Sequence, residues 1–355
     1  MTTLAHLPGI RSRRISTARG RFQVLEAGDP VGEVVLFVHG NIAAATFWEE
    51  TMLALPTAYC AIAPDLRGYG LSDRLPVDAT RGMRDFSADL HTLSGALGLE
   101  RFHLVGHSLG GCVAMQYAIE HPQRVRSLTL VAAGSPYGFG GTKDTDGTPC
   151  WPDYAGSGGG LIHPEWLQRL KMGDRSDDSN FSPLRMLRER LLTRPLAPRR
   201  ESALLEAILL THTDTDNYSR DLMPSTNWPG FAPGTRGVNN AISPRYCNLS
   251  ALATITPRPP ICWIRGDQDQ VVADQALSDV GTLGAMGLIP GWPGVVFFPP
   301  QPMVSQLRAV LQRYRANGGT YQEHILAGTR HMPFLDDLAA FMGVWLPFLS
   351  AVNGR

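Results

Sequence analysis

The sequence predicts an α/β protein: a doubly wound, mostly parallel sheet with an inserted, largely helical lid. Short apolar runs alternate with stretches of helical apolar spacing over residues 34–131 and again after residue 261. Between residues 135 and 260 this alternation stops, and Gly, Pro, Asp, Ser and Trp become frequent. We therefore expect residues 1–134 and 261–355 to form one α/β domain that carries the chemistry, and residues 135–260 to form the lid.

The first part of the chain supplies most of the predicted sheet. Residues 13–16 and 21–26 are expected to be two short strands on either side of a turn. Residues 34–38 and 60–65 are apolar runs, typical of parallel strands that are buried on both faces. Further strands are expected at 101–106 and 127–131, and helices at 46–54, 83–97 and 110–121.

The rest of the chain is predicted to hold the lid and the end of the sheet. The glycine run at 156–160 is expected to be a flexible loop and not a phosphate cradle, because no Lys-Ser or Lys-Thr pair follows it. Helices are expected in the lid at 165–171, 183–192 and 201–210. Strands are expected at 261–265 and 321–326, a second insertion between them at about 276–319 with a helix at 303–314, and a last helix at 335–349.

The composition argues against several classes of function. The 32 basic and 32 acidic side chains give a formal net charge of zero, so nothing favours nucleic acid or an anionic membrane as a partner. No run approaches the ~18 apolar residues that span a bilayer, and residues 1–21 lack the apolar core of a secretory signal, so we expect a cytoplasmic protein.

The five cysteines are odd in number and show no metal-ligand spacing. Cys60, Cys112 and Cys262 lie in apolar stretches and are expected to be small core residues. Cys150 and Cys247 lie in loop-like sequence, and the sequence leaves open whether these two pair.

A nucleophile is predicted at Ser108, in the pentapeptide Gly106-His107-Ser108-Leu109-Gly110. It follows the strand-like residues 102–105 and opens the helix-like stretch 111–120. Glycines two residues to either side permit a tight strand-to-helix turn, because a Cβ at either place would collide with the neighbouring strand or helix. In such a turn the serine backbone is strained and its hydroxyl is held clear of the sheet. This setting predicts a serine hydrolase.

A carboxylate and a histidine are expected later in the chain, because a serine hydroxyl is a weak nucleophile without a base and a group that orients the base. The expected order is serine, acid, histidine. Asp267 and Asp269 both follow the strand at 261–265, and His331 follows the last strand. All of them therefore emerge at the same edge of the sheet as Ser108.

An oxyanion hole needs two N–H donors near the nucleophile. One is expected to be the backbone N–H of Leu109, which directly follows Ser108 at the start of a helix. The other is expected from the loop His39-Gly40-Asn41 after the strand at 34–38, and we choose the N–H of Asn41.

These motifs resemble the α/β-hydrolase superfamily, in the lid-bearing type shared by esterases, lactonases, epoxide hydrolases and haloalkane dehalogenases. The matching segments are His39-Gly40-Asn41, Asp65-Leu66-Arg67-Gly68-Tyr69-Gly70-Leu71-Ser72, Gly106-His107-Ser108-Leu109-Gly110-Gly111, Gly266-Asp267-Gln268-Asp269 and His331-Met332-Pro333. The resemblance implies Asp269 as the acid, because the family acid stands three residues after the strand-ending glycine. Epoxide hydrolases and dehalogenases carry Asp where this chain has Ser108, which disfavours both activities. Arg330 stands before His331 where the family commonly has Gly, which is a departure from the pattern.

The expected function is hydrolysis of a carboxylic ester or lactone through an acyl-enzyme, without a cofactor or metal. Aromatic residues that could line a pocket for a bulky, apolar small-molecule substrate are Phe47, Trp48, Trp151 and Trp228, although core packing would explain each equally well. Hydrolysis of a carbon–carbon bond or an amide, or cofactor-free perhydrolysis, would use the same three residues. A receptor that binds a small ligand with little turnover is the alternative outside enzymes. The sequence leaves the oligomeric state open, a homo-oligomer included.

Overall fold

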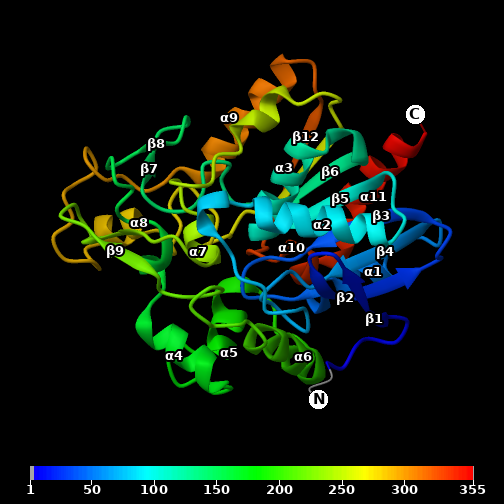
Figure 1. Cartoon of the computed structure of the whole chain (residues 1–355), viewed down its shortest axis with the longest axis horizontal. Helices are drawn as coiled ribbons and strands as arrows, with labels where there is room; N and C mark the ends of the chain where they lie inside the picture. Colours follow the sequence, from blue (N-terminus) through cyan, green and yellow to red (C-terminus); the bar gives the residue numbers. More distant parts are fainter. Residues whose placement is uncertain (1–3, 355) are drawn as a thin grey trace.

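A computed structural model describes residues 4–354, and its centre is a mixed sheet of eight strands (Figure 1). The strands are β1 (Arg11–Thr17), β2 (Gly20–Gly28), β3 (Glu33–Val38), β4 (Tyr59–Pro64), β5 (Phe102–His107), β6 (Val125–Val131), β11 (Ile261–Gly266) and β12 (Tyr321–Leu326). Their order across the sheet is β1-β2-β4-β3-β5-β6-β11-β12. Strand β2 is antiparallel to both of its neighbours, and all pairs from β4 to β12 are parallel. The predicted fold class is confirmed, with strand bounds within two residues of those expected for nearly every strand.

Helices flank this sheet in two separate groups. Helix α3 (Leu109–Glu120) packs on α2 (Arg84–Ala96), whereas the carboxyl-terminal α11 (Leu338–Asn353) packs on α1 (Glu49–Leu53). The central strands are buried because both faces are covered: every residue of β4 and β5 is buried. This explains why their sequences are apolar runs without the alternation of a strand that faces water on one side.

The inserted segment (residues 135–260) combines short helices with two small sheets, beside and below the main sheet in the view of Figure 1. Its helices are α4 (Pro164–Met172), α5 (Pro183–Met186), α6 (Pro198–Leu209) and α7 (Val238–Ala241). Its two-stranded sheets pair β7 (Thr142–Lys143) with β8 (Thr148–Pro149), and β9 (Leu222–Pro224) with β10 (Phe231–Pro233). The helix expected over 183–192 is α5 followed by a π-helical turn at Leu187–Leu191.

The second insertion carries α8 (Val280–Ala285) and α9 (Met303–Ala316), and the last strand is followed by α10 (Pro333–Asp336). Helix α9 agrees with the helix expected at 303–314. The last helix is interrupted, because Asp337 has a non-helical backbone and caps the start of α11 by accepting a hydrogen bond from the Ala340 N–H.

The glycine run at 156–160 is not the loose loop that we expected. Residues Gly158–Leu161 form a 3₁₀ turn, and Gly158 and Gly159 are buried. A Cβ added to Gly160 would lie 2.0 Å from the Phe231 ring, so the glycine is needed for close packing.

Arg200 in α6 ties the inserted segment to the sheet domain. Its guanidinium contacts Glu49 at 2.9 Å and Glu50 at 2.5 Å, and it also donates to the carbonyl oxygen of Thr46. Glu49 is fully buried, and its carboxylate is paired with this arginine and lies 2.7 Å from a ring nitrogen of His6.

All five cysteines are buried and free. Cys150 and Cys247 therefore do not pair, and both are core residues although the surrounding sequence is loop-like. Among residues 4–354, no helix has the length and apolar character needed to cross a membrane, and no group of three or more His, Cys, Asp or Glu side chains is arranged to hold a metal ion.

Candidate active site

The strand-to-helix turn at Ser108 has the strained geometry that its sequence predicts. Ser108 lies between β5 and α3 with φ 53° and ψ −117°, a conformation that costs energy for any residue with a Cβ. The turn is held by hydrogen bonds on both sides: the Ser108 N–H donates to the Val131 carbonyl (3.0 Å), and the Gly111 N–H donates to the Ser108 carbonyl (2.9 Å). The surrounding structure therefore fixes the serine in place.

The glycines around the turn are required by close approach. A Cβ on Gly106 would lie 2.2 Å from the Gly110 carbonyl oxygen, and a Cβ on Gly110 would lie 2.3 Å from the Val38 carbonyl oxygen. A Cβ on Gly40 would lie 3.1 Å from the Ser108 Cβ. The loop after β3 therefore passes directly against the serine, as an oxyanion loop must.

The structure brings His331 and Asp269 together in a buried pair. The His331 Nδ1 lies 2.9 Å from the Asp269 Oδ2, and each side chain is only 3% exposed. The other carboxylate oxygen accepts hydrogen bonds from the N–H groups of Val271 (2.8 Å) and Val272 (3.0 Å). A carboxylate held in this way can only accept, so it fixes the His331 proton on Nδ1 and leaves Nε2 as an acceptor.

Asp267, the alternative acid, has a different role. Its side chain is exposed, and its Oδ1 accepts a hydrogen bond from the Gly328 N–H at 2.8 Å. It stabilises the loop that precedes His331 but does not contact the imidazole. The geometry thus favours Asp269, as the family resemblance implied.

His107 connects the serine turn to the histidine loop, a contact that the sequence did not reveal. Its Nε2 lies 2.9 Å from the carbonyl oxygen of His331, and the two rings are 4.7 Å apart. Burial holds the pKa of His107 well below 6.5, and the nearby His331 lowers it further, so the ring is neutral and donates from Nε2. Among the described residues 4–354, no hydrogen bond joins Ser108 to His331. A hydrogen bond between a catalytic serine and its base often becomes short only when substrate binds.

The two predicted oxyanion donors lie on the loop after β3 and at the start of α3. Leu109 is the first residue of α3, so its N–H has no acceptor within the helix. The side chain of Asn41 is held by three neighbours: its Oδ1 accepts from the Ile42 N–H (3.0 Å) and the Tyr69 hydroxyl (2.5 Å), and its Nδ2 donates to the Asn239 Oδ1 (3.1 Å). These bonds fix the backbone whose N–H we chose as the second donor.

His39 shapes the same loop from inside. One ring nitrogen lies 2.8 Å from the Gly40 carbonyl, and the other accepts a hydrogen bond from the Leu66 N–H at 2.9 Å. Burial lowers the pKa of His39 to about 4, against the opposing effect of its bond to Gly40. His39 is therefore a neutral structural residue at neutral pH.

The aromatic pocket candidates lie in two places. Phe47 and Trp48 are fully buried near the site: Trp48 stacks on Phe334 with ring centres 4.2 Å apart and meets the His107 ring edge-on at 6.3 Å. Trp151 and Trp228 instead pack around Phe298 in a separate apolar cluster with the second insertion. That these residues line a substrate pocket stays a prediction.

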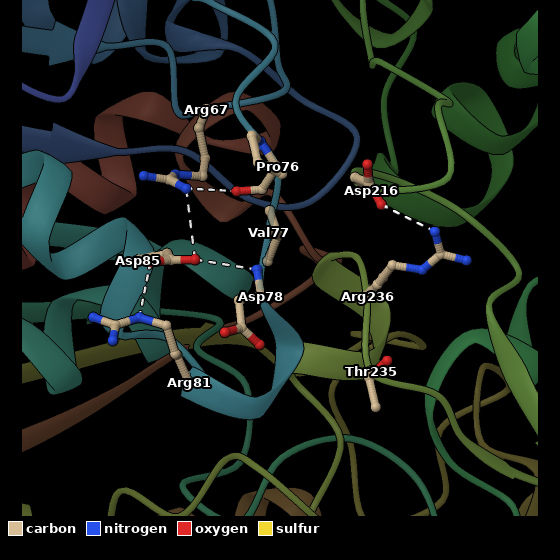
Figure 2. Close-up of a pocket in the computed structure, with 9 residues that line it drawn as sticks. All are labelled: Arg67, Pro76, Val77, Asp78, Arg81, Asp85, Asp216, Thr235 and Arg236. Atoms are coloured by element: carbon tan, nitrogen blue, oxygen red, sulfur yellow. Dashed lines mark hydrogen bonds and ion pairs between the residues drawn. The ribbon is translucent and has the colours of Figure 1, made fainter.

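A surface cleft of about 540 Å³ lies elsewhere, where the loop after β4 meets the inserted segment (Figure 2). Five of its six charged side chains pair with one another: Asp85 with Arg81 (3.0 Å) and with Arg67 (3.5 Å), and Arg236 with Asp216 (3.4 Å). None of the predicted catalytic or oxyanion residues lines it. The cleft therefore marks the junction between the inserted segment and the sheet domain.

Comparison with known proteins gives a family and a fold. The family model described as alpha/beta hydrolase fold matches residues 33–291. An uncharacterized protein of Mycobacterium tuberculosis is 38% identical over 144 residues, and a 2-hydroxy-6-oxo-6-phenylhexa-2,4-dienoate hydrolase of Comamonas testosteroni is 36% identical over 113 residues. These matches cover 39% and 31% of this chain, and 38% of each relative. The chain thus matches only about two fifths of the length of these relatives.

Solved structures share the fold over nearly the whole chain. A serine hydrolase from Cycloclasticus zankles has a TM-score of 0.63 at 18% identity, and covers 96% of this chain and 98% of its own. An esterase from Exiguobacterium antarcticum has a TM-score of 0.59 at 17% identity, with coverage of 96% and 100%. The family match spans well over half of the chain and agrees with the observed sheet. The protein belongs to the α/β-hydrolase family.

Proposed function

We propose that this hydrolase cleaves a carboxylic ester or lactone through an acyl-enzyme formed on Ser108. His331 removes the proton from the serine hydroxyl as it attacks the carbonyl carbon and then delivers that proton to the leaving alcohol. Asp269 holds the imidazole in the tautomer that leaves Nε2 free to accept. The N–H groups of Asn41 and Leu109 stabilise the oxyanion. Water then attacks the acyl-enzyme: His331 removes a proton from the water and returns it to the Ser108 oxygen as the acid is released.

The observation that carries this proposal is the buried His331–Asp269 pair next to a strained serine turn. A carboxylate 2.9 Å from the imidazole Nδ1, with its second oxygen held by two backbone N–H groups, is the arrangement that orients a general base. A purely structural serine would not require a residue with a Cβ at φ 53°. Strain of this kind fits a nucleophile that must be presented in one geometry.

The inserted segment acts as the lid of this site. Its helix α7 contacts the oxyanion loop through Asn239, and Arg200 of α6 fastens it to α1. A cover over the site excludes water from it and strengthens the electrostatic stabilisation of the oxyanion. The substrate is then a small molecule that fits between the lid and the sheet.

Other bonds remain candidates for the same machinery. Relatives that match about 30% of this chain include the Comamonas testosteroni dienoate hydrolase and a carbamate hydrolase of Variovorax paradoxus, 41% identical over 109 residues. We favour the ester because solved structures of the same fold over nearly the whole chain include esterases. A panel of esters, lactones, amides and diketones compared by kcat/KM separates these reactions.

The direct test of the acyl-enzyme is a burst experiment with para-nitrophenyl butanoate. We expect a rapid release of nitrophenol equal to the amount of active sites, followed by slower turnover, and a butanoyl adduct on the Ser108 peptide after acid quench. Hydrolysis in S108A at the wild-type rate would contradict the proposal. So would wild-type turnover of amides or diketones with no turnover of any ester or lactone.

A further inference from the structure

Asn239 in helix α7 is a residue of the inserted segment that contacts the loop of the predicted oxyanion donor. Its side-chain oxygen accepts a hydrogen bond from Asn41, a residue of the oxyanion loop 198 positions away in the sequence. Its Nδ2 is buried and has no hydrogen-bond partner within residues 4–354. An unpaired buried donor costs about 1–3 kcal/mol, so its retention next to an active site requires a reason.

The direction of this amide is set by its neighbours. A backbone N–H can only donate, so the side-chain oxygen of Asn41 must be the atom that faces the Ile42 N–H. The Asn41 Nδ2 must then be the group that faces Asn239, and a donor there requires the oxygen of Asn239. The remaining group of Asn239, its NH₂, is therefore the one without a partner. Reversing either amide would place two donors or two acceptors against each other.

The residue that follows helix α7 lies close to the residues that support the serine turn. Ile242 lies three residues after Asn239 and so shares its face of the helix. The Ile242 side chain lies beside Gly134: a Cβ added there would be 4.0 Å from the Ile242 Cδ1. The Gly134 N–H in turn donates to the Ser108 carbonyl at 3.2 Å. One face of α7 thus contacts both the oxyanion loop and the residues that support the nucleophile.

The next residue, Asn240, shows what a structural asparagine looks like in this helix. Its Oδ1 accepts from the N–H groups of Gly159 (2.7 Å) and Gly234 (3.1 Å), and its Nδ2 donates to the carbonyl oxygens of Asp221 and Arg236 (both 2.7 Å). Asn240 is fully bonded and fixes α7 in place. Asn239 is therefore presented from a rigid support with its donor unused.

We infer that Asn239 is a substrate-binding residue whose NH₂ donates to a second oxygen of the substrate, close to the scissile carbonyl. This inference rests on the proposed function and narrows its substrate class to esters that carry an uncharged acceptor, an ether, keto or hydroxyl oxygen, in the acyl or the alcohol part. An uncharged acceptor can pair with this donor without the cost of burying a charge, and a pure hydrocarbon would leave the buried N–H unpaired.

Two pairs of isosteric esters test this inference. Para-nitrophenyl methoxyacetate and butanoate differ by one oxygen in the acyl part, and methoxyethyl and butyl acetate differ by one oxygen in the alcohol part. The measured quantity is the ratio of kcat/KM within each pair, divided by the same ratio for alkaline hydrolysis in solution. We expect the wild type to prefer the oxygen-bearing member of at least one pair by about 10-fold, the effect of one buried hydrogen bond.

The variants separate substrate binding from support of the loop. Asn239→Asp keeps an acceptor for Asn41 but removes the donor, and Asn239→Leu removes both. We expect each to lose the 10-fold preference, and Asn239→Leu to lower kcat for both members of a pair as well. Asn248→Asp is the matched control: this asparagine is exposed, its oxygen accepts from Ser250, and the same substitution leaves that contact intact. It should keep the wild-type ratio.

Each outcome decides one claim. Equal kcat/KM ratios in the wild type, Asn239→Asp and Asn239→Leu would overturn the inference and leave the proposed serine hydrolase untouched. If Asn239→Leu does not fold, the kcat/KM ratio of Asn239→Asp alone decides. Equal loss on all four esters in both variants would assign Asn239 to support of the loop and would also overturn it. A folded wild type that hydrolyses none of the four esters and forms no acyl adduct would overturn the proposed function and this inference with it.

Discussion

At the scale of single residues, a few contacts decide the chemistry. The acid could be Asp267 or Asp269 on the basis of strand order alone, and the hydrogen bond to His331 distinguishes them. The strained turn at Ser108 was predictable because such a turn imposes local rules on five consecutive residues. The contact of Asn239 was not predictable, because its partner Asn41 is 198 positions away and no local pattern marks a contact made by the inserted segment.

The two aspartates give a matched pair of substitutions. In D269N the amide would keep its oxygen toward the backbone N–H groups of Val271 and Val272 and present NH₂ to His331, which forces the wrong imidazole tautomer. We expect kcat on para-nitrophenyl butanoate to fall by about 10³–10⁴-fold. D267N, which alters only an exposed contact to Gly328, should stay within about threefold of the wild type, since surface substitutions change little. A larger loss in D267N than in D269N would reject Asp269 as the orienting acid.

At the scale of elements, hydrophobic periodicity predicted the long strands and helices, and tertiary contacts determine the rest. The apolar runs of β3, β4 and β5 could only be buried strands. Helix α7 and the sheets β7–β8 and β9–β10 have two to four residues per element, too few for a period to show. The glycine run at 156–160 misled for a related reason: its glycines pack closely against residues that are distant in the sequence, such as Gly160 against Phe231.

The attachment of the inserted segment through Arg200 predicts a stability effect at this scale. R200A would leave the buried Glu49 without its guanidinium partner, so we expect the free energy of unfolding to fall by about 3–5 kcal/mol. Arg185 is the control, because its pair with Glu189 lies one helical turn away on the surface, and R185A should cost at most about 0.5 kcal/mol. Urea unfolding curves of the two variants measure both values. Equal effects would mean that Arg200 does not anchor the inserted segment.

At the scale of the whole molecule, the parallel sheet brings distant residues to one edge. Strands β5, β11 and β12 are followed by Ser108, Asp269 and His331 respectively, and their shared direction is what makes these residues neighbours. This convergence follows from the α/β pattern and was predictable. The single contacts that hold the inserted segment, such as those of Arg200 and Asn239, were not predictable, because each joins residues far apart in the sequence.

The buried ionisable groups predict how stability changes with pH. Burial lowers the pKa of His39 to about 4 in the folded protein from 6.5 in the unfolded chain. As pH falls, the unfolded state therefore binds the proton first. The contribution of neutral His39 to the free energy of unfolding is complete above pH 6.5 and is lost as pH falls toward 4, by up to about 1.4 kcal/mol per pH unit. His107 acts in the same direction. Burial raises the pKa of Asp65 to about 6 from 3.8 in the unfolded chain. Its contribution to the free energy of unfolding is therefore complete below pH 3.8 and is lost as pH rises toward 6, which is opposite to the effect of the two histidines.

H39Q tests this account, because glutamine can donate and accept as the imidazole does but does not titrate. We expect the free energy of unfolding of the wild type to fall between pH 6.5 and 5, and the slope in H39Q to be smaller by up to about 1.4 kcal/mol per pH unit. Urea unfolding at several pH values gives both slopes. Identical slopes in the two proteins would show that His39 is not a buried neutral histidine.

The central claim, that Ser108 is an activated nucleophile, is tested most directly by labelling with a fluorophosphonate and mapping the adduct by mass spectrometry. The account predicts a label on Ser108 that is absent from S108A and falls sharply in H331A. A folded wild-type protein that stays unlabelled, or a label on another residue that persists in S108A, would contradict it. A small ligand that binds tightly with no product, equally in the wild type and S108A, would then point to a receptor on this fold.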